Sequence, residues 1–220
     1  MNHEYSFFMP EKRVPLGPQE FISSAMELVK LNGLTSLSMR ALGAHMGVDA
    51  TALYRHFPNK DSLVWALIDA MLGEIVAEED PVHLSPRERV VILATNMRNA
   101  FRHNPDVGLA LIDSEGLSQN GIEISRRGIR ALRDLGLQGL DLVRIYQSFE
   151  GYVMGCCVMD FSGAPHNFEI RRARYRFVDM PELDDAARSV ELVEEITEDG
   201  FLEALHAILD RAESLVKKSK

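Results

Sequence analysis

Four side chains that could recognise a polar surface share one face of a predicted helix: Ala50, Thr51, Tyr54 and Arg55. Leu53 and Phe57, four residues apart, fall on the opposite face and should point inward. The outward face is small, polar and aromatic. A Thr or Ala methyl group can contact a thymine methyl, and hydroxyl groups can reach phosphates or bases. This pattern predicts a helix suited to the major groove of DNA.

Two short helices around a tight turn must position this face. Ser38 and Asp49 are candidate N-caps of the two helices. Each cap lies between the two apolar residues of a hydrophobic staple: Leu37 with Leu42, and Val48 with Leu53. Gly47 follows the last apolar residue of the first helix, where a left-handed backbone ends a helix with little steric penalty. Pro58 should end the second helix.

The stretch GVDATALYRHFPNKDSL, preceded by SMRALGAHM, resembles the helix-turn-helix of the TetR family of one-component bacterial transcriptional regulators. The resemblance covers residues 18–72. Its matching features are the Gly47-Val48 turn, the Leu-Tyr-x-His-Phe segment at 53–57, Lys60, and a preceding helix that ends at Asn32-Gly33. This combination is far more specific than a generic helix-turn-helix.

The resemblance implies a set of residues that contact DNA: Arg40, Ala50, Thr51, Tyr54, Arg55, His56 and Lys60. Arg40 would contact a base or a phosphate, and the third helix would face the groove. Tyr54, His56 and Lys60 would contact phosphates. Asp49 is unfavourable in a DNA-binding helix because it places a carboxylate near the phosphates of DNA. Its capping role and the helix dipole offset part of this repulsion. Base readout should therefore rest on Arg40, Thr51 and Tyr54.

The composition is that of an ordinary globular chain, since 220 residues with 46% hydrophobic content can bury a proper core. The net charge of −9 is unevenly distributed. Residues 1–60 carry six basic and five acidic side chains, whereas residues 61–220 carry 18 and 28. The acidity therefore belongs to the body of the molecule, and a local positive patch would suffice for phosphate contacts.

Several features bear on compartment and cofactors. No apolar run reaches membrane-spanning length, and residues 1–17 lack the pattern of a signal peptide. Cys156 and Cys157 are adjacent, unlike the spaced cysteines of a secreted disulfide protein, and in an apolar segment their thiols should be inert. The histidines form no metal-ligand pair, so we expect no metal and no other cofactor. We expect a cytoplasmic protein associated with the nucleoid.

The pattern along the chain predicts an all-α protein in three parts: a flexible arm at 1–17, a helix-turn-helix DNA-binding domain with a connecting helix at 18–80, and a helical ligand-binding and dimerisation domain at 81–220. In the arm, Lys12 and Arg13 either reach DNA or form a solvated tail. The first helix should span 19–31, and Asn59 should cap the fourth, connecting helix. An acidic run ending at Pro81 marks the second boundary.

The body should consist of successive helices: one from Pro86 to Pro105, a short one within 108–117, one at 119–135, one at 140–161, and a last one opened by Thr197, Asp199 and Gly200 that runs to 216. Four arginines of the 119–135 helix should form a solvated outer face: Arg126, Arg127, Arg130 and Arg133. Residues 162–181 predict a loop, whose basic RRARYR segment should pair with acidic residues between 179 and 198.

Dimerisation is expected on two segments. Leu140–Phe161 contains the run GYVMGCCVM, which is apolar on all sides, so one side should face the subunit's own core and the other a partner subunit. In the TetR family the last two long helices commonly pair with their symmetry mates. The resemblance therefore implies a homodimer through Leu140–Phe161 and Phe201–Val216.

The resemblance also implies a small-molecule pocket inside the body whose filling moves the fourth helix. Its candidate lining comes from two helices: Met97, Phe101, His103, Tyr146, Phe149, Glu150, Tyr152, Met154 and Met159. The alternative for each of these residues is a place in the hydrophobic core, where Met and aromatic side chains at helical spacing usually lie.

Three functions follow from these patterns. The first is a homodimeric repressor that binds a palindromic operator in double-stranded DNA and is released by a small, apolar effector. The second is a DNA-binding regulator or activator that responds to no ligand. The third is an enzyme with a DNA-binding head, but the sequence has no nucleophile elbow, metal-ligand motif or phosphate-binding glycine loop, so we expect no enzyme.

Overall fold

The computed structural model describes residues 16–77, 80–112, 118–159, 182 and 189–218. Within these ranges every regular element is a helix, which confirms the predicted all-α class. The chain divides into two compact units, one ending at Ser62 and the other beginning at Leu63. None of the described helices is both long enough and apolar enough to cross a membrane. The expectations for Lys12, Arg13 and residues 162–181 lie outside the described residues.

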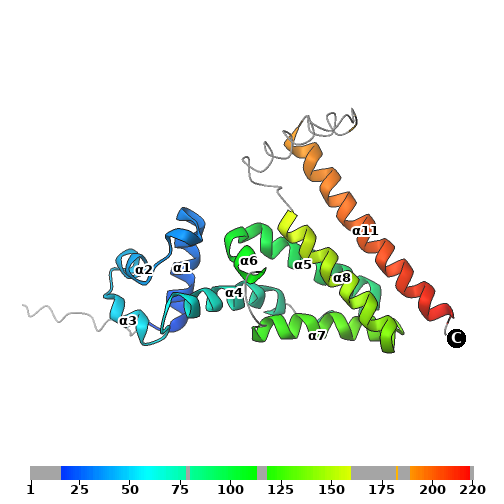
Figure 1. Cartoon of the computed structure of the whole chain (residues 1–220), viewed down its shortest axis with the longest axis horizontal. Coiled ribbons are helices and arrows are strands. Elements are labelled where there is room, and N and C mark those ends of the chain that lie inside the picture. Colours follow the sequence, from blue (N-terminus) through cyan, green and yellow to red (C-terminus); the bar gives the residue numbers. More distant parts are fainter. Residues whose placement is uncertain (1–15, 78–79, 113–117, 160–181, 183–188, 219–220) are drawn as a thin grey trace, which may run out of the picture. The chain divides into compact units, whose positions relative to one another are not determined.

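The first unit is built from short helices: α1 Pro18–Asn32, η1 Leu34–Ser36, α2 Met39–Met46 and α3 Ala50–Tyr54 (Figure 1). The start of α1 is capped by Glu20, whose carboxylate accepts a hydrogen bond from the Gly17 N–H at 2.9 Å. Side chains from all three α-helices are buried in its core: Phe21, Ala25, Leu28, Leu42 and Leu53. This core fixes the orientation of α3, the helix with the candidate recognition face.

The predicted caps of α2 and α3 are confirmed. Ser38 Oγ accepts a hydrogen bond from the Ala41 N–H at 3.1 Å, and Asp49 Oδ1 accepts one from the Thr51 N–H at 2.8 Å. Gly47 ends α2 in the left-handed region, with φ of 67°. Gly43 lets the turn approach α2 closely, because a Cβ at this position would lie 2.9 Å from the Val48 carbonyl oxygen.

The predicted end of α3 at Pro58 is wrong, because the helix ends at Tyr54. The Leu53 carbonyl accepts hydrogen bonds from both the His56 and Phe57 N–H groups, each at 2.9 Å. This shared acceptor tightens the last turn and ends the regular helix before the proline. Arg55 and His56 consequently lie in a turn that follows α3.

The connecting helix α4, Lys60–Ala77, is capped by Asn59 as predicted, because Asn59 Oδ1 accepts a hydrogen bond from the Ser62 N–H at 2.8 Å. The compact units divide near the beginning of this helix, whereas the expected boundary followed its end. The reason is that most of α4 packs within the second unit. Asp69, for example, accepts hydrogen bonds from the backbone and side chain of Asn120 at 3.0 Å.

The second unit continues with α5 Pro86–His103, α6 Pro105–Ile112, α7 Gln119–Asp134, α8 Gly139–Met159 and α11 Val190–Lys218. Helix α5 packs against α6, α7, α8 and α11, and α11 also lies alongside α8 (Figure 1). The predicted start of α5 is confirmed by a capping box. Ser85 Oγ accepts from the Glu88 N–H at 3.3 Å, and the Ser85 N–H donates to Glu88 Oε2 at 2.9 Å.

The predicted start of the last helix at Thr197 to Gly200 is wrong, because α11 already begins at Val190. Ser189 Oγ accepts a hydrogen bond from the Leu192 N–H at 3.1 Å, as an N-cap does. Val193 extends the buried stripe of the helix by two turns ahead of Phe201. Burial of this stripe overrides the local turn preference of Asp199 and Gly200, which remain exposed inside the helix.

Candidate nucleic-acid interface and ligand cavity

The predicted recognition face is the exposed face of α3. Leu53 is completely buried and Phe57 nearly so, whereas the side chain of Tyr54 is 52% exposed. Thr51 is exposed as well, and Ala50 is partly exposed. The inward and outward sides of this helix are therefore those that the spacing of its residues predicts.

The other candidate DNA contacts lie around this helix in the same unit. Arg40 is exposed on α2, and Arg55 is exposed in the turn after α3. His56 is exposed and packs its ring on Phe21 of α1, with ring centroids 5.5 Å apart. Lys60 is partly buried, and its Nζ donates a hydrogen bond to the Leu34 carbonyl at 3.3 Å. Lys60 thus ties α4 to η1 and keeps further N–H donors for another partner.

The carboxylate of Asp49 is stabilised as an anion by its capping role. Hydrogen bonds from the Thr51 side chain and backbone N–H lower the pKa of Asp49 below its ordinary value of 3.8. Because the Thr51 hydroxyl is engaged by this cap, its methyl group is left as a contact for a ligand of the α3 face.

The second unit contains a partly open cavity of about 670 Å³ among α4, α5, α6, α7 and α8. A volume of roughly 300–1,000 Å³ is usual for small-molecule sites. Five candidates line it: Met97, Tyr146, Phe149, Glu150 and Met154. Four of the five come from α8. Leu72 of α4 also lines the cavity. The structure thus brings these five candidates together around one space.

The remaining candidates do not line this cavity. Phe101 is buried against α6, where a Cβ on Gly108 would come within 2.5 Å of its ring. His103 is exposed at the end of α5, with its Nδ1 2.8 Å from the Asn99 carbonyl oxygen. Tyr152 faces α11, where its hydroxyl donates to the Phe201 carbonyl at 3.0 Å. Met159 is 52% exposed.

Sequence reasoning missed the walls of the cavity that α6 and α7 supply: Leu111, Ile112, Ser118, Gly121, Ile124 and Ser125. The available signal was the spacing of Gly121 and Ser125, which are small residues four apart on the inner side of an amphipathic helix. Small side chains at such positions leave space between packed helices. These residues place α7 next to the Tyr146 side of α8.

Tyr146 contacts two other polar side chains of the cavity, Glu150 and Ser125. Its hydroxyl donates a hydrogen bond to Glu150 Oε1 at 2.9 Å. Burial raises the pKa of Tyr146, and Glu150 adds to this increase, while a hydrogen bond with Ser125 opposes it. The phenol therefore stays neutral at physiological pH and acts as a donor toward the carboxylate.

Helix α7 also holds the C-terminal half of α4. Asn120 Nδ2 donates to the Asp69 carbonyl at 2.9 Å, and Arg127 Nη2 donates to the Val76 carbonyl at 2.8 Å. The expectation that Arg127 belongs to a solvated face is thus wrong, because its guanidinium satisfies a carbonyl in the last turn of α4. α7 therefore contacts both the cavity and the connecting helix.

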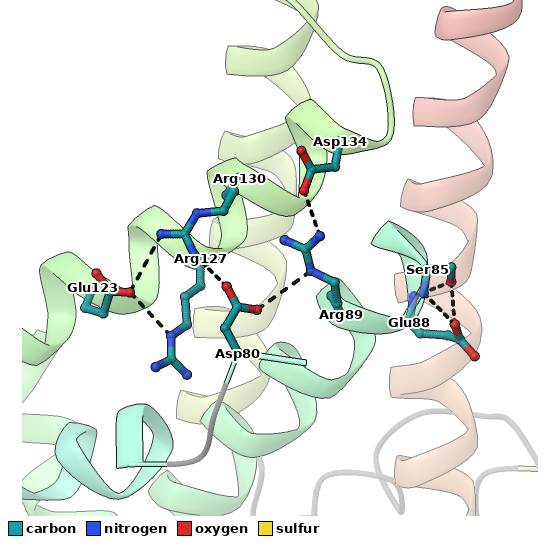
Figure 2. Close-up of polar contacts among 8 residues, drawn as sticks. All are labelled: Asp80, Ser85, Glu88, Arg89, Glu123, Arg127, Arg130 and Asp134. Carbon is teal, nitrogen blue, oxygen red and sulfur yellow. Dashed lines mark hydrogen bonds and ion pairs between the residues drawn. The ribbon is translucent and has the colours of Figure 1, made fainter. Parts of the chain in front are cut away.

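A network of charges continues this contact beyond α4, at Asp80 (Figure 2). Arg130 Nη1 lies 2.6 Å from Asp80 Oδ2, while the Arg130 side chain remains 47% exposed, as expected of the solvated face. Arg89 is buried on α5, with its Nε 3.7 Å from Asp80 Oδ1 and its Nη1 2.7 Å from Asp134 Oδ2. Glu123 adds a second carboxylate near Arg130, at 3.9 Å. The network links the α4–α5 connection to α7.

Comparison with known families agrees with this arrangement. Residues 21–67 match the family described as bacterial regulatory proteins, tetR family. Residues 85–214, more than half of the chain, match the tetracyclin repressor-like C-terminal domain. The chain belongs to the TetR family. The helix-turn-helix thus falls in the first matched region, and most of the cavity lining falls in the second.

A relative of this TetR-family chain is the HTH-type transcriptional repressor Rv1353c of Mycobacterium tuberculosis (strain ATCC 25618 / H37Rv). The two are 30% identical over 154 residues, which make up 68% of this chain and 59% of the relative. The chain thus spans less than two thirds of the length of this curated relative.

Two solved structures share the fold. ActR from Streptomyces coelicolor in complex with actinorhodin matches with a TM-score of 0.68 and 22% identity, over 92% of this chain and 99% of ActR. BioQ from Mycobacterium smegmatis with its double-stranded DNA operator matches with a TM-score of 0.63 and 23% identity, over 90% of this chain and 99% of BioQ. At these identities the likeness establishes a common fold.

Proposed function

We propose that this chain is a homodimeric transcriptional repressor that binds a palindromic operator through α2 and α3. A small, largely apolar effector bound in the α4–α8 cavity releases it from DNA. The proposal is supported by the relative named a repressor and by the similar folds of ActR bound to actinorhodin and BioQ bound to its operator.

The DNA-binding part of the proposal rests on the exposed face of α3 and its surroundings. Thr51 and Tyr54 offer a methyl group, a hydroxyl and an aromatic ring. Arg40 and Arg55 offer guanidinium groups for phosphates or bases, and His56 offers a ring nitrogen. Lys60 contributes an ammonium next to η1. Of these residues, Arg40, Thr51 and Tyr54 would read bases.

The observation that supports effector release most directly is the position of Leu72. This residue lines the cavity and belongs to α4, the helix whose first residue, Lys60, immediately follows the helix-turn-helix. A ligand that enlarges the cavity would therefore push on α4 from the Leu72 side. α7 would transmit the same displacement through Asn120 and Arg127.

Dimerisation is supported by apolar side chains that α8 and α11 expose. On α8, Leu140 is 70% exposed and Val143 49%. On α11, Ile196 is 48% exposed. Burying such side chains against a symmetry mate would give an isologous interface, and a dimer would present two recognition helices to the two halves of a palindrome.

A gel-shift titration on DNA from upstream of the gene tests the proposal, with salt varied and competitor DNA present. We expect saturable binding that survives competitor, and a loss of at least about tenfold in affinity on Tyr54→Ala. Sedimentation equilibrium should give twice the mass of the chain. Two results would contradict the proposed repressor: binding to DNA that competitor DNA abolishes, or specific binding by a protein that sediments as a monomer.

A further inference from the structure

The charge of the cavity restricts what it can bind. Its lining is mostly aliphatic and aromatic, with a few polar side chains: Ser118, Ser125, Tyr146, Gln147 and Glu150. Among the described lining residues, Glu150 is the one with a formal charge, and none is Lys, Arg or His. Within the part of the lining that the structure describes, the negative charge of Glu150 therefore has no basic partner.

The polar groups near Glu150 are oriented to leave this charge available. Tyr146 donates its hydroxyl to Glu150 Oε1, and among the described residues this is the polar contact that the carboxylate makes. Glu150 is exposed, so it lies at the open side of the cavity, where an entering ligand would meet it. Oε2 and the remaining lone pairs of Oε1 can accept from a ligand or face a cation.

The aromatic rings of the cavity also favour a cation over an anion. Tyr146 and Phe149 both line the cavity within one turn of Glu150 on α8. The face of an aromatic ring attracts a cation, and the attraction increases when the cation is desolvated. An anionic ligand would instead meet Glu150 without a basic partner in the described lining, and it would lose its hydration without compensation.

From the lone carboxylate, its Tyr146 donor and the apolar volume around them, we propose that the effector is a lipophilic cation. Its apolar body occupies the space between α5, α7 and α8, and its positive group lies against Glu150. This inference rests on the proposed function, since it names the chemical class of that function's effector.

Isothermal titration calorimetry with two probes of equal shape and opposite charge tests the inference. Tetraphenylphosphonium is the cation and tetraphenylborate the anion. We expect the wild-type protein to bind the cation at least about tenfold more tightly than the anion. Glu150→Gln, which keeps the shape of the side chain, should remove most of this preference. Glu27→Gln on α1 removes an equal charge at a position distant in sequence from Glu150, and it should leave the preference for the cation unchanged.

Three results would overturn the inference: no binding of tetraphenylphosphonium to the wild type, an equal or greater affinity for tetraphenylborate, or a preference that Glu150→Gln does not reduce. Gel shifts of the same samples separate this inference from the proposed function. Cation-selective binding that leaves the protein on DNA would support the ligand class and contradict effector release. Operator binding together with anion preference would contradict the ligand class alone.

Discussion

Asp80 and Arg130 form an ion pair that connects the α4–α5 junction to α7, with Oδ2 and Nη1 2.6 Å apart (Figure 2). The Asp80 side chain is 16% exposed, and its other oxygen faces the buried guanidinium of Arg89. One carboxylate therefore compensates two cations, one of them almost without access to water. Asp80 should therefore contribute more to the stability of the fold than a carboxylate in an exposed ion pair.

Asp80→Asn should lower the free energy of unfolding by about 1–2 kcal/mol, because it leaves the buried Arg89 with less compensating charge. Asp141→Asn is the matched control, since Asp141 pairs with Arg144 on the surface, at 3.3 Å. That exposed pair should contribute less than about 0.5 kcal/mol. Urea unfolding of the two variants measures both effects, and equal destabilisation would contradict the role assigned to Asp80.

Arg40→Ala should weaken operator binding and reduce the slope of log affinity against log salt by about one, because it removes one positive charge from the proposed DNA-binding surface. Arg211→Ala on α11 removes the same charge from an exposed position of the second unit and should leave the slope unchanged. Fluorescence anisotropy at several salt concentrations gives the two slopes. An unchanged slope for Arg40→Ala would contradict the place of Arg40 on the proposed DNA-binding surface.

Gly200→Ala should raise the free energy of unfolding by about 0.5–1 kcal/mol, because alanine favours a helix interior more than glycine does. A Cβ at this position meets no atom within 4 Å. Had α11 begun at Gly200, the substitution would give little gain. Thermal unfolding followed by circular dichroism distinguishes these outcomes, and a destabilised variant would contradict the helix as it extends from Val190.

The α5 capping box should make stability depend on pH through Glu88. Hydrogen bonds from the Ser85 side chain and N–H lower the pKa of Glu88 below its ordinary value of 4.5. A lowered pKa in the folded state means that the stabilisation is present above pH 4.5 and is lost as the pH falls through the folded value. The advantage of the wild type over Glu88→Gln in urea unfolding should therefore shrink below pH 4.5. A constant difference from pH 7 to pH 3 would show that the cap does not depend on charge.

The sequence by itself determined the starts of α2, α3, α4 and α5 and the exposed face of α3. The caps at Ser38, Asp49, Asn59 and Ser85 each join atoms two or three residues apart, so neighbouring residues decide whether they form. The inward position of Leu53 likewise follows from helical spacing. These local relationships need no knowledge of the rest of the chain.

The tertiary structure alone decided which side chains line the cavity and which arginines form hydrogen bonds with distant parts of the chain. Met97 reaches the cavity, whereas Phe101, one turn further along α5, packs into the space that Gly108 leaves on α6. Arg127 has the sequence context of a solvated residue, but it donates to Val76, 51 positions away. Such contacts depend on the rotation and spacing of helices that are distant in sequence, and burial over the whole domain fixes both.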